Sequence, residues 1–309
     1  MSETASASPL QSFSAALAEL VARGAGHVVS VQSHRARASG IAWRPGLIVT
    51  ADEALGDEAL GDKALGDEAL AGDGKIAVTL PDGTTVPATI AGRDPTTDIA
   101  LLRIARADLP PPPPAAAPAQ PGALALVLGA QDGAPSVALG VVARAGGAWR
   151  SLRGGEIDAR IELDAAPRRA AEGGLVLDAA GGALGMAVFG PRRRVLVIPG
   201  ATIDRVAGML AAHGRIARGY LGLALQPVPV EGGGAGIMVI SVDPRGPGAA
   251  AGIFQGDVIV AWAGEKVRGV RALLRTLGPA TIGEVVPLTL QRAGAPVALN
   301  ITIGERPAA

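Results

Sequence analysis

Glu172 carries a carboxylate in a loop between two β-like segments. The stretch LDAAPRRAAEGGLVLD, residues 163–178, ends one β-like segment, crosses a loop containing Arg168 and Arg169, and restarts at a Gly-Gly pair. Glu172 directly precedes that pair. A glutamate can serve as a nucleophile or as a metal ligand, but only with suitable groups around it. The chemistry of this loop therefore depends on its partners.

Groups that could act as a base or as an alternative nucleophile are scarce in the chain. It has three histidines, His27, His34 and His213, and no cysteine. No serine occurs between Ser151 and Ser241. A nucleophilic hydroxyl needs a base within hydrogen-bond reach. We expect the three histidines to be surface or capping residues rather than displaced bases.

Composition places the chain among globular proteins of two or three domains. It has 309 residues, of which 49% are hydrophobic and 18% charged, enough to bury a large core. Lys plus Arg (28) equal Asp plus Glu (28), and aromatic residues make up 2%, so no nucleic-acid partner is expected. The absence of cysteine excludes disulfides and thiolate metal sites. No cofactor and no metal are expected.

The N-terminus and the hydropathy pattern predict a soluble, cytoplasmic protein. MSETASASPLQSF is polar and acidic and lacks the apolar core of a secretory signal. No uninterrupted apolar stretch approaches the ~18 residues of a membrane span. A misassigned start would change the expected location to the periplasm.

Short β-type runs separated by turn residues fill most of the chain and predict closed or sandwiched β domains. Before them, Phe13, Leu17, Leu20 and Val21 follow a helical spacing, with Gly24 as the expected helix stop. The expected strands are HVVSVQ (27–32), GLIVT (46–50), KIAVTLPDG (75–83), TVPATIAG (85–92), DIALLRI (98–104), ALALVLG (123–129), VALGVVARA (137–145), IDARIEL (157–163), GLVLD (174–178), LGMAVF (184–189) and VLVIP (195–199).

Two irregular segments interrupt these strands. LPPPPPAAAPAQP, residues 109–121, is expected to be an extended linker between two β units, because proline fixes φ and removes a donor. Residues 51–70 hold four copies of a five-residue unit, within an acidic insertion at 51–74. A period of five spreads the leucines around a helix, which favours a solvated or disordered insertion. An acidic arm for a basic partner is the alternative.

A third unit begins at about Arg218, after a helix that carries Ile203, Val206 and Leu210 on one face. This unit resembles a PDZ domain of the bacterial, circularly permuted kind. YLGL (220–223) is similar to the carboxylate-binding loop, SVDPRGPGAAAGIFQGDVIVAWAGEKV (241–267) to the central signature, and VRALLRTL (270–277) to the groove helix.

The PDZ resemblance implies that the unit binds the C-terminus of a partner protein or an unfolded peptide by strand addition. A fold used only for assembly is the alternative. The resemblance assigns peptide binding to a loop and a pocket wall, made of Tyr220, Leu221, Gly222, Leu223, Val270, Leu273 and Leu274.

The segment from Phe13 to His213 resembles the trypsin-like protease domain of the HtrA/DegP family. GLIVT is similar to the strand before the family's catalytic histidine, and VTLPDGTTVPATIAGRDPTTDIALLRI (78–104) to the segment carrying its catalytic aspartate. LDAAPRRAAEGGLVLD lies where the family has its nucleophile loop. The fold implied is mainly β: a double β-barrel body of the chymotrypsin type, followed by an α+β PDZ domain. The expected boundaries are 1–26 for an N-terminal segment with a short helix, 27–213 for the barrels and 218–306 for the PDZ domain.

The resemblance places a degenerate catalytic triad at Glu53, Asp98 and Glu172. Only Asp98 retains the family's residue type, since Glu53 stands at the histidine and Glu172 at the serine. Ala170 replaces the glycine of the turn that shapes the oxyanion hole. Without an imidazole and a hydroxyl, the serine mechanism is lost.

Three carboxylates within a few ångströms require compensation to stay ionised. We expect salt bridges from nearby arginines, with splayed, solvated carboxylates or a divalent metal as alternatives. The expected arginines are Arg168, Arg169, Arg192, Arg193 and Arg194.

The function expected is that of an inactive HtrA-like pseudoprotease, a scaffold or chaperone-like adaptor that binds peptides through its PDZ domain. An active HtrA-type serine endopeptidase of protein quality control and a metal-gated binding protein are the alternatives. The family's trimers imply a homotrimer, with Phe13 the one N-terminal aromatic available to support it.

Overall fold

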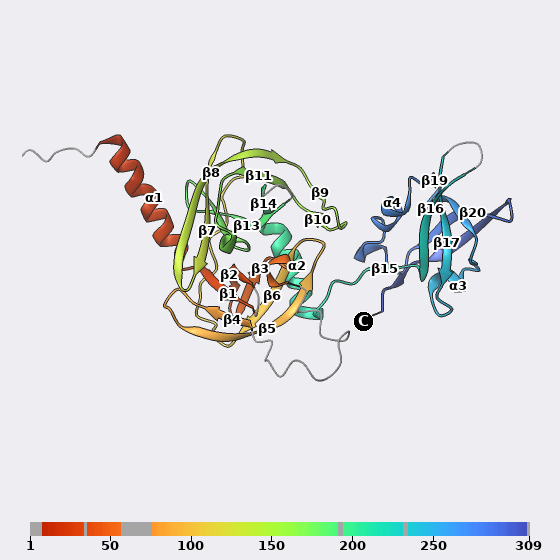
Figure 1. Ribbon diagram of the computed structural model, residues 1–309, viewed down its shortest axis with the longest axis horizontal. Coiled ribbons are helices and arrows are strands. Elements are labelled where there is room, and N and C mark those ends of the chain that lie inside the picture. Colours follow the sequence, from red (N-terminus) through yellow and green to blue (C-terminus); the bar gives the residue numbers. More distant parts are fainter. Residues whose placement is uncertain (1–7, 34–35, 57–75, 191–193, 231–233, 308–309) are drawn as a thin grey trace, which may run out of the picture. The chain divides into compact units, whose positions relative to one another are not determined.

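Two units make up the chain, residues 1–215 and residues 216–309. The computed structural model describes residues 8–33, 36–56, 76–190, 194–230 and 234–307. The expectations for His34, for most of the acidic repeat and for Arg192 and Arg193 lie outside the described residues. The first unit contains two closed β-barrels and two helices, and the second contains a separate sheet (Figure 1).

Six strands close the first barrel in the order β1–β2–β3–β6–β5–β4, all antiparallel. Sequence patterns predicted five of these strands and missed β2, RASGIAWR. Residues 38–42 of β2 are all buried, because this strand also packs against a strand of the second barrel. Burial on both faces removes the alternation that marks a strand. The bounds are β1 Val28–Gln32, β2 Arg37–Arg44, β3 Leu47–Thr50, β4 Ile76–Thr79, β5 Thr85–Asp94 and β6 Ile99–Ile104.

The second barrel is also six-stranded, in the order β11–β14–β13–β12–β7–β8. The proline-rich segment between the barrels runs along this one, where the Ala115 amide donates to the Ala183 carbonyl at 3.1 Å. A two-stranded hairpin, β9 Trp149–Arg150 and β10 Glu156–Ile157, projects between β8 and β11. The barrel strands are β7 Leu124–Gln131, β8 Ala134–Gly146, β11 Arg160–Asp164, β12 Leu175–Asp178, β13 Ala183–Phe189 and β14 Val195–Pro199.

Helix α1, Pro9–Ala25, begins at a capping box in which the Ser8 hydroxyl accepts from the Gln11 amide. The predicted stop at Gly24 is wrong, since the helix ends at Ala25 and Gly26 caps it. Gly24 is instead a packing residue: a Cβ there would lie 2.3 Å from Cδ1 of Leu128. A glycine near a helix end can therefore mark either a cap or a close contact, and Gly24 marks a close contact.

Helix α2, Gly200–His213, packs against strands of both barrels. Ile203, Val206 and Leu210 are fully buried on one face, as their spacing predicts. Gly214 ends the helix in the left-handed conformation, and its amide donates to the Leu210 carbonyl. None of the helices in the described part of the chain is long and apolar enough to span a membrane.

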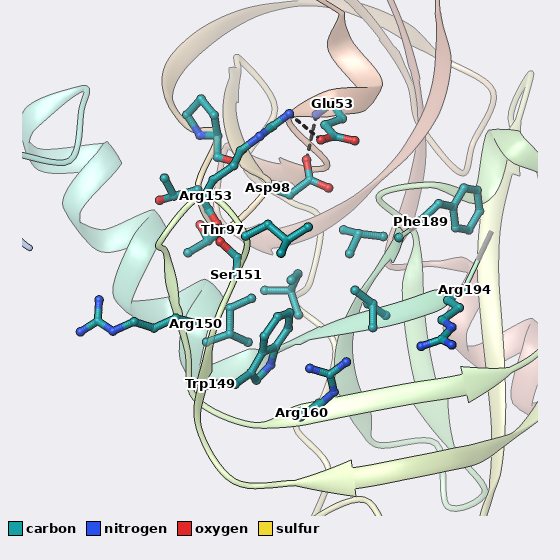
Figure 2. Close-up of a pocket in the computed structure, with 18 residues that line it drawn as sticks. Glu53, Thr97, Asp98, Trp149, Arg150, Ser151, Arg153, Arg160, Phe189 and Arg194 are labelled. Carbon is teal, nitrogen blue, oxygen red and sulfur yellow. Dashed lines mark hydrogen bonds and ion pairs between the residues drawn. The ribbon is translucent and has the colours of Figure 1, made fainter. Parts of the chain in front are cut away.

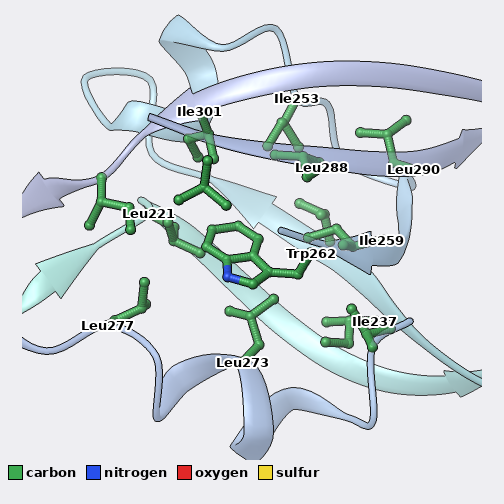
Figure 3. Packing of buried hydrophobic residues seen from close by; sticks show 14 residues of the cluster. Leu221, Ile237, Ile253, Ile259, Trp262, Leu273, Leu277, Leu288, Leu290 and Ile301 are labelled. Atoms are coloured by element: carbon green, nitrogen blue, oxygen red, sulfur yellow. The ribbon is translucent and has the colours of Figure 1, made fainter. Parts of the chain in front are cut away.

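The second unit is an antiparallel sheet with short helices, built around a single core. Trp262 lies at the centre of that core, between Leu221, Leu273 and Leu277 (Figure 3). The main sheet runs β16–β17–β18–β20–β21, with β19 paired to β18 and a separate pair β15–β22. The elements are β15 Gly219–Tyr220, β16 Leu223–Pro229, β17 Ala235–Val242, α3 Pro247–Ala250, β18 Val258–Trp262, β19 Glu265–Lys266, α4 Val270–Leu274, β20 Val285–Arg292, β21 Ala295–Thr302 and β22 Gly304–Glu305.

Candidate functional site

Asp98 and Glu53 meet at one edge of the first barrel. Glu53 opens a 3₁₀ turn, Glu53–Leu55, just after β3, and Asp98 lies at the start of β6. The Glu53 backbone amide donates to Oδ1 of Asp98 at 2.8 Å. Asp98 has a positive φ of 57°, a conformation that aspartate tolerates. A carboxylate held in this way orients the residue that follows β3.

The loop before Asp98 is held by a second aspartate. Asp94 is buried, and its carboxylate accepts hydrogen bonds from the Thr96 hydroxyl at 2.5 Å and the Thr97 hydroxyl at 2.7 Å. The Thr96 amide also donates to Asp94. These bonds fix the turn that leads from β5 into β6, so that Asp98 has a defined position.

Glu172 follows a 3₁₀ turn, Arg169–Ala171, on the second barrel. Its carbonyl accepts from the Ser39 amide of β2 at 2.8 Å, which ties this loop to the first barrel. Its own amide donates to the Arg169 carbonyl at 3.1 Å, closing the turn. That amide is therefore already hydrogen-bonded inside the loop. It is not directed at a space where a developing oxyanion could lie.

The three carboxylates interact electrostatically. Burial raises the pKa of Asp98 to about 7, and the charges of Glu53, Glu172 and Asp52 act in the same direction. The hydrogen bond from the Glu53 amide opposes this rise. Burial also raises the pKa of Glu172, with a further contribution from Glu53. The site therefore favours a protonated carboxyl over three ionised ones.

The main compensating cation is Arg153, which the sequence analysis did not nominate. Its Nη2 lies 2.8 Å from Oε1 of Glu53, and its Nη1 donates to the Pro95 carbonyl at 3.2 Å. Arg169 lowers the pKa of Glu172, as expected of a neighbouring cation. Arg194 instead lies 3.8 Å from Glu162. The prediction of salt bridging thus describes the site, but its principal arginine comes from the hairpin tip.

The hairpin β9–β10 is also attached to the backbone of the turn that precedes Asp98. The Ser151 hydroxyl donates to the Thr96 carbonyl at 2.6 Å, in the turn that leads to Asp98. Gly155 approaches the same carbonyl so closely that a Cβ would lie 2.4 Å from it. The β9–β10 hairpin of the second barrel therefore covers the turn that precedes Asp98 in the first barrel.

A cleft of about 810 Å³ lies between this hairpin and the strands of the second barrel (Figure 2). Glu53, Asp98 and Arg153 gather at one end of it, whereas Trp149, Arg160 and Arg194 lie toward the other. The Arg160 guanidinium lies 4.7 Å from the Trp149 ring centroid. Between these ends the cleft is apolar, with lining residues Ile157, Val188, Leu196 and Ile198. The cleft suits an extended chain with apolar side chains.

The groups needed for other chemistry are not gathered at this cleft. The Nδ1–H of His27 donates a hydrogen bond to the Pro110 carbonyl at 2.8 Å, and His213 is exposed in the last turn of α2. Both fit the expected capping and surface roles. Across the described ranges, no three His, Asp or Glu side chains are arranged to hold a metal ion. The metal alternative thus gains no support.

In the second unit, the loop predicted to bind a carboxylate joins β15 to β16. Gly222 has a φ of 69°, and its carbonyl accepts from the Asp243 amide at 2.8 Å. The Tyr220 hydroxyl donates to Asp243 at 3.0 Å, which raises the pKa of the tyrosine. Leu223 begins β16, a strand at the edge of the sheet. These bonds to Asp243 hold the loop in place, and none of them involves the open edge of β16.

The predicted pocket wall divides into core and surface. Leu221 and Leu273 are buried in the core of the unit (Figure 3). Val270 is partly buried, and Leu274 is half exposed. Helix α4 packs beside β16, the two elements between which the predicted peptide groove would run. Val270 and Leu274, one helical turn apart, are the wall residues that remain available to a ligand.

Comparison with known proteins identifies both units. The family model described as trypsin-like peptidase domain matches residues 38–186, and the PDZ domain model matches residues 219–303. A probable periplasmic serine endoprotease, DegP-like, of Brucella suis biovar 1 is 32% identical over 247 residues, which cover 74% of this chain and 48% of the relative. The chain thus spans about half the length of this relative.

Solved structures agree over nearly the whole chain. The serine endoprotease from Yersinia pestis has a TM-score of 0.68 and 26% identity, covering 94% of this chain and 98% of that one. The HtrA-type protease AlgW with a tripeptide has a TM-score of 0.64 and 25% identity, covering 94% of this chain and 98% of that one. The predicted double-barrel body and PDZ domain are confirmed.

The comparisons also correct one expectation. The DegP-like relatives, from Brucella, Chlamydia and Rhizobium among others, are named periplasmic, which contradicts the cytoplasmic location predicted for this chain. With two closed barrels, a following PDZ domain and these relatives, the chain is an HtrA/DegP-like protein of the trypsin-like peptidase and PDZ families.

Proposed function

We propose that this chain is a peptide-binding HtrA/DegP-like protein whose barrels do not cleave peptides by the serine mechanism. One observation carries the proposal: Glu53, whose backbone amide donates to Asp98, and Glu172, whose carbonyl accepts from Ser39 of the first barrel, hold the positions where the resemblance places a histidine and a serine. Neither is an imidazole or a hydroxyl. Two acids cannot supply both the base and the nucleophile that acyl transfer by a serine requires.

The hydrogen bonding of the loop around Glu172 also supports the absence of peptide cleavage. A tetrahedral intermediate needs backbone amides directed at its oxyanion. The Glu172 amide is hydrogen-bonded to Arg169 instead, and an ionised Glu172 would repel a developing negative charge. Peptide binding in the cleft does not require these groups, so binding can persist where hydrolysis cannot.

The second unit supplies the binding activity in this proposal. Strand β16 pairs with β17 along one edge, and no strand of the described chain pairs with its other edge. A peptide with a free C-terminus can add to that edge, with its carboxylate at the Tyr220–Leu223 loop and its last side chain near Val270 and Leu274. The expected partners are protein C-termini or unfolded peptides, and we propose a periplasmic setting like that in the relatives' names.

An active endopeptidase of protein quality control is the second candidate. The names of the relatives favour it, since they are serine endoproteases. It requires a nucleophile and a base other than those at Glu53 and Glu172. The remaining polar side chains at that end of the cleft are those of Asp98, Arg153, Thr96, Thr97 and Ser151. The three hydroxyls already donate hydrogen bonds, to Asp94 and to the Thr96 carbonyl, and no histidine lines the described cleft to act as their base.

One experiment separates the two candidates. Purified wild-type protein is incubated with a fluorogenic casein and, separately, with a fluorophosphonate probe, beside the variant Glu172→Ala. We expect no turnover above a buffer control and no probe adduct. Turnover in the wild type that Glu172→Ala abolishes, or an adduct on the barrel unit, would contradict the proposal. Equal turnover in both proteins with an adduct on this chain would also contradict it, whereas equal turnover with no adduct on this chain would identify a contaminant.

Self-association as a homotrimer also remains a proposal. Apolar side chains are exposed on α1 and on β8, which contacts that helix. They are Leu10, Phe13, Val137, Leu139 and Val141. Light scattering at micromolar concentration is expected to give three times the mass of one chain, and Leu139→Asp with Phe13→Ser to lower it. A monomeric wild type would overturn this part.

A further inference from the structure

A run of positive charge covers helix α4 and the residues on either side of it in the second unit. Between Lys266 and Arg275 there are four cationic residues and no acidic one. All four side chains are exposed, and the segment includes the whole of α4. Across the described residues of this chain, neither Arg268 nor Arg271 forms an ion pair. Their charge is therefore available to a ligand.

The direction of α4 decides where along a bound peptide these charges lie. The Gly219 amide donates to the Leu277 carbonyl at 3.2 Å, so the chain just after α4 lies at the carboxylate-binding loop. Arg271, at the beginning of α4, must then lie toward the opposite end of the groove. Helix α4 ends at Leu274, and i→i+3 turns continue it to Leu277, where the Leu277 amide donates to the Leu274 carbonyl. At a rise of about 1.5 Å per residue, Arg271 is therefore roughly 9 Å from Leu277.

The same distance can be expressed in peptide residues. A peptide antiparallel to β16 would have its last residue near Leu223 and would extend by about 3.4 Å per residue. Roughly 9 Å corresponds to about three residues. Arg268 precedes α4 and is separated from it by Gly269, which is not helical. With Arg271 about three residues from the terminus, we expect the two arginines to face the third to fifth residues before it.

Main-chain recognition ends at about the same point. Pro227 and Pro229 have no amide hydrogen, and proline in a strand is tolerated where its nitrogen faces the open edge. Leu223 and Leu225 also have their backbone nitrogens on the open edge, because every second residue of β16 faces the same way, and both have amide hydrogens. A bound peptide can therefore pair with β16 over its last three or four residues only. Preceding residues must be recognised through their side chains.

We propose that this groove selects C-terminal peptides that carry Asp or Glu three to five residues before the terminal carboxylate, with Arg268 and Arg271 as the selecting residues. The inference rests on the proposed function of the second unit as a peptide binder and adds the chemical class of its ligand. Opposite charges across an interface contribute chiefly to selectivity and association rate, and they are screened by salt.

The test uses the full chain and fluorescein-labelled decapeptides ending in Val, Leu or Phe. Each peptide is made with Glu, Gln or Lys at the third to fifth positions before the end, and with either a free or an amidated C-terminus. Binding is measured by fluorescence polarisation at low and at high salt. With a free terminus, we expect the Glu peptides to bind about three- to tenfold more tightly than the Gln peptides at low salt, and the Lys peptides to bind least tightly.

Variants assign the preference to its residues. Arg268→Gln with Arg271→Gln is expected to bind Glu and Gln peptides equally, whereas Arg268→Lys with Arg271→Lys keeps the charge and most of the preference. High salt should remove the preference in the wild type. The Gln peptides should bind the wild type and both variants alike, which shows that the groove remains folded.

Two kinds of failure are distinguishable. If no peptide binds, or if amidated and free peptides bind alike, the proposed function of the second unit fails. If binding needs the free carboxylate but Glu, Gln and Lys peptides bind equally, the proposed function stands and the charge inference is overturned. A preference for Glu that survives in the double Gln variant also overturns it.

Discussion

Asp98 is the residue in which the altered site has its clearest physical consequence. Its carboxyl is largely buried and lies near the charges of Glu53 and Glu172. Burial raises its pKa to about 7, from the ordinary value near 4. Between pH 4 and pH 7 the folded chain therefore holds a proton that the unfolded chain releases. The free energy of unfolding decreases as pH rises through that window.

Asp98→Asn tests this dependence. The variant keeps a side-chain oxygen that can accept from the Glu53 amide, and it carries no charge at any pH. We expect it to be more stable than wild type by about 1 to 3 kcal/mol at pH 8 and nearly equal to it at pH 4. Urea unfolding curves at the two pH values measure the difference.

Asp132→Asn is the matched control for that substitution. Asp132 also has a positive φ, of 52°, and its exposed carboxylate pairs with Arg37 at 3.1 Å. Its replacement should change stability by less than about 1 kcal/mol, because exposed ion pairs contribute little. An effect of Asp98→Asn that is the same at pH 4 and pH 8 would show that the carboxyl is not buried in its charged form.

At the scale of elements, the turn that presents Glu172 depends on two glycines. Gly173 has a φ of 80°, and a Cβ there would lie 2.3 Å from the Ser39 carbonyl of β2. A Cβ at Gly174 would lie 2.2 Å from the Leu128 carbonyl of β7. Backbone atoms cannot move aside as a side-chain end can. The turn is therefore wedged between the two barrels by close backbone contacts.

Gly173→Ala should consequently destabilise the first unit by more than about 2 kcal/mol, from a strained φ and a backbone clash together. Gly208→Ala is the opposite case, because Gly208 is exposed inside α2 and a Cβ there would meet nothing within 4 Å. That variant should gain up to about 1 kcal/mol from helix propensity. Chemical denaturation of both variants checks the contrast, and equal effects would refute it.

At the scale of the whole molecule, the two units have separate cores. The core around Trp262 contains residues of the second unit only. The barrels have their own buried residues, among them Ile41, which is fully buried. Each unit should therefore unfold in its own transition. The expected boundary between the barrels and the PDZ domain, 213–218, remains a prediction that such a measurement addresses.

Calorimetry with two core variants tests this independence. Trp262→Ala should lower the transition temperature of the second unit, at a cost of about 3 to 5 kcal/mol, and leave that of the barrels in place. Ile41→Ala should do the reverse, at about 2 to 5 kcal/mol. A substitution that shifts both transitions equally would show that the units unfold together.

The sequence by itself determined most of the strands, though not β2, because local patterns such as the alternation in β4 need no knowledge of the distant chain. The double-barrel fold and the PDZ domain followed from family resemblance, carried by stretches such as the signature at 241–267. It also identified Glu53, Asp98 and Glu172 as the residues to examine, through the resemblance of the segments that carry them.

Only the tertiary structure decided which groups surround those residues. Arg153 compensates Glu53 across a sequence separation of 100 residues, and β2 lacks the alternation of a strand because the second barrel also covers it. Gly24 lies inside a helix because a leucine side chain of β7 leaves no room for a Cβ. Each depends on a contact between segments far apart in the chain, and local residue types carry no record of such contacts.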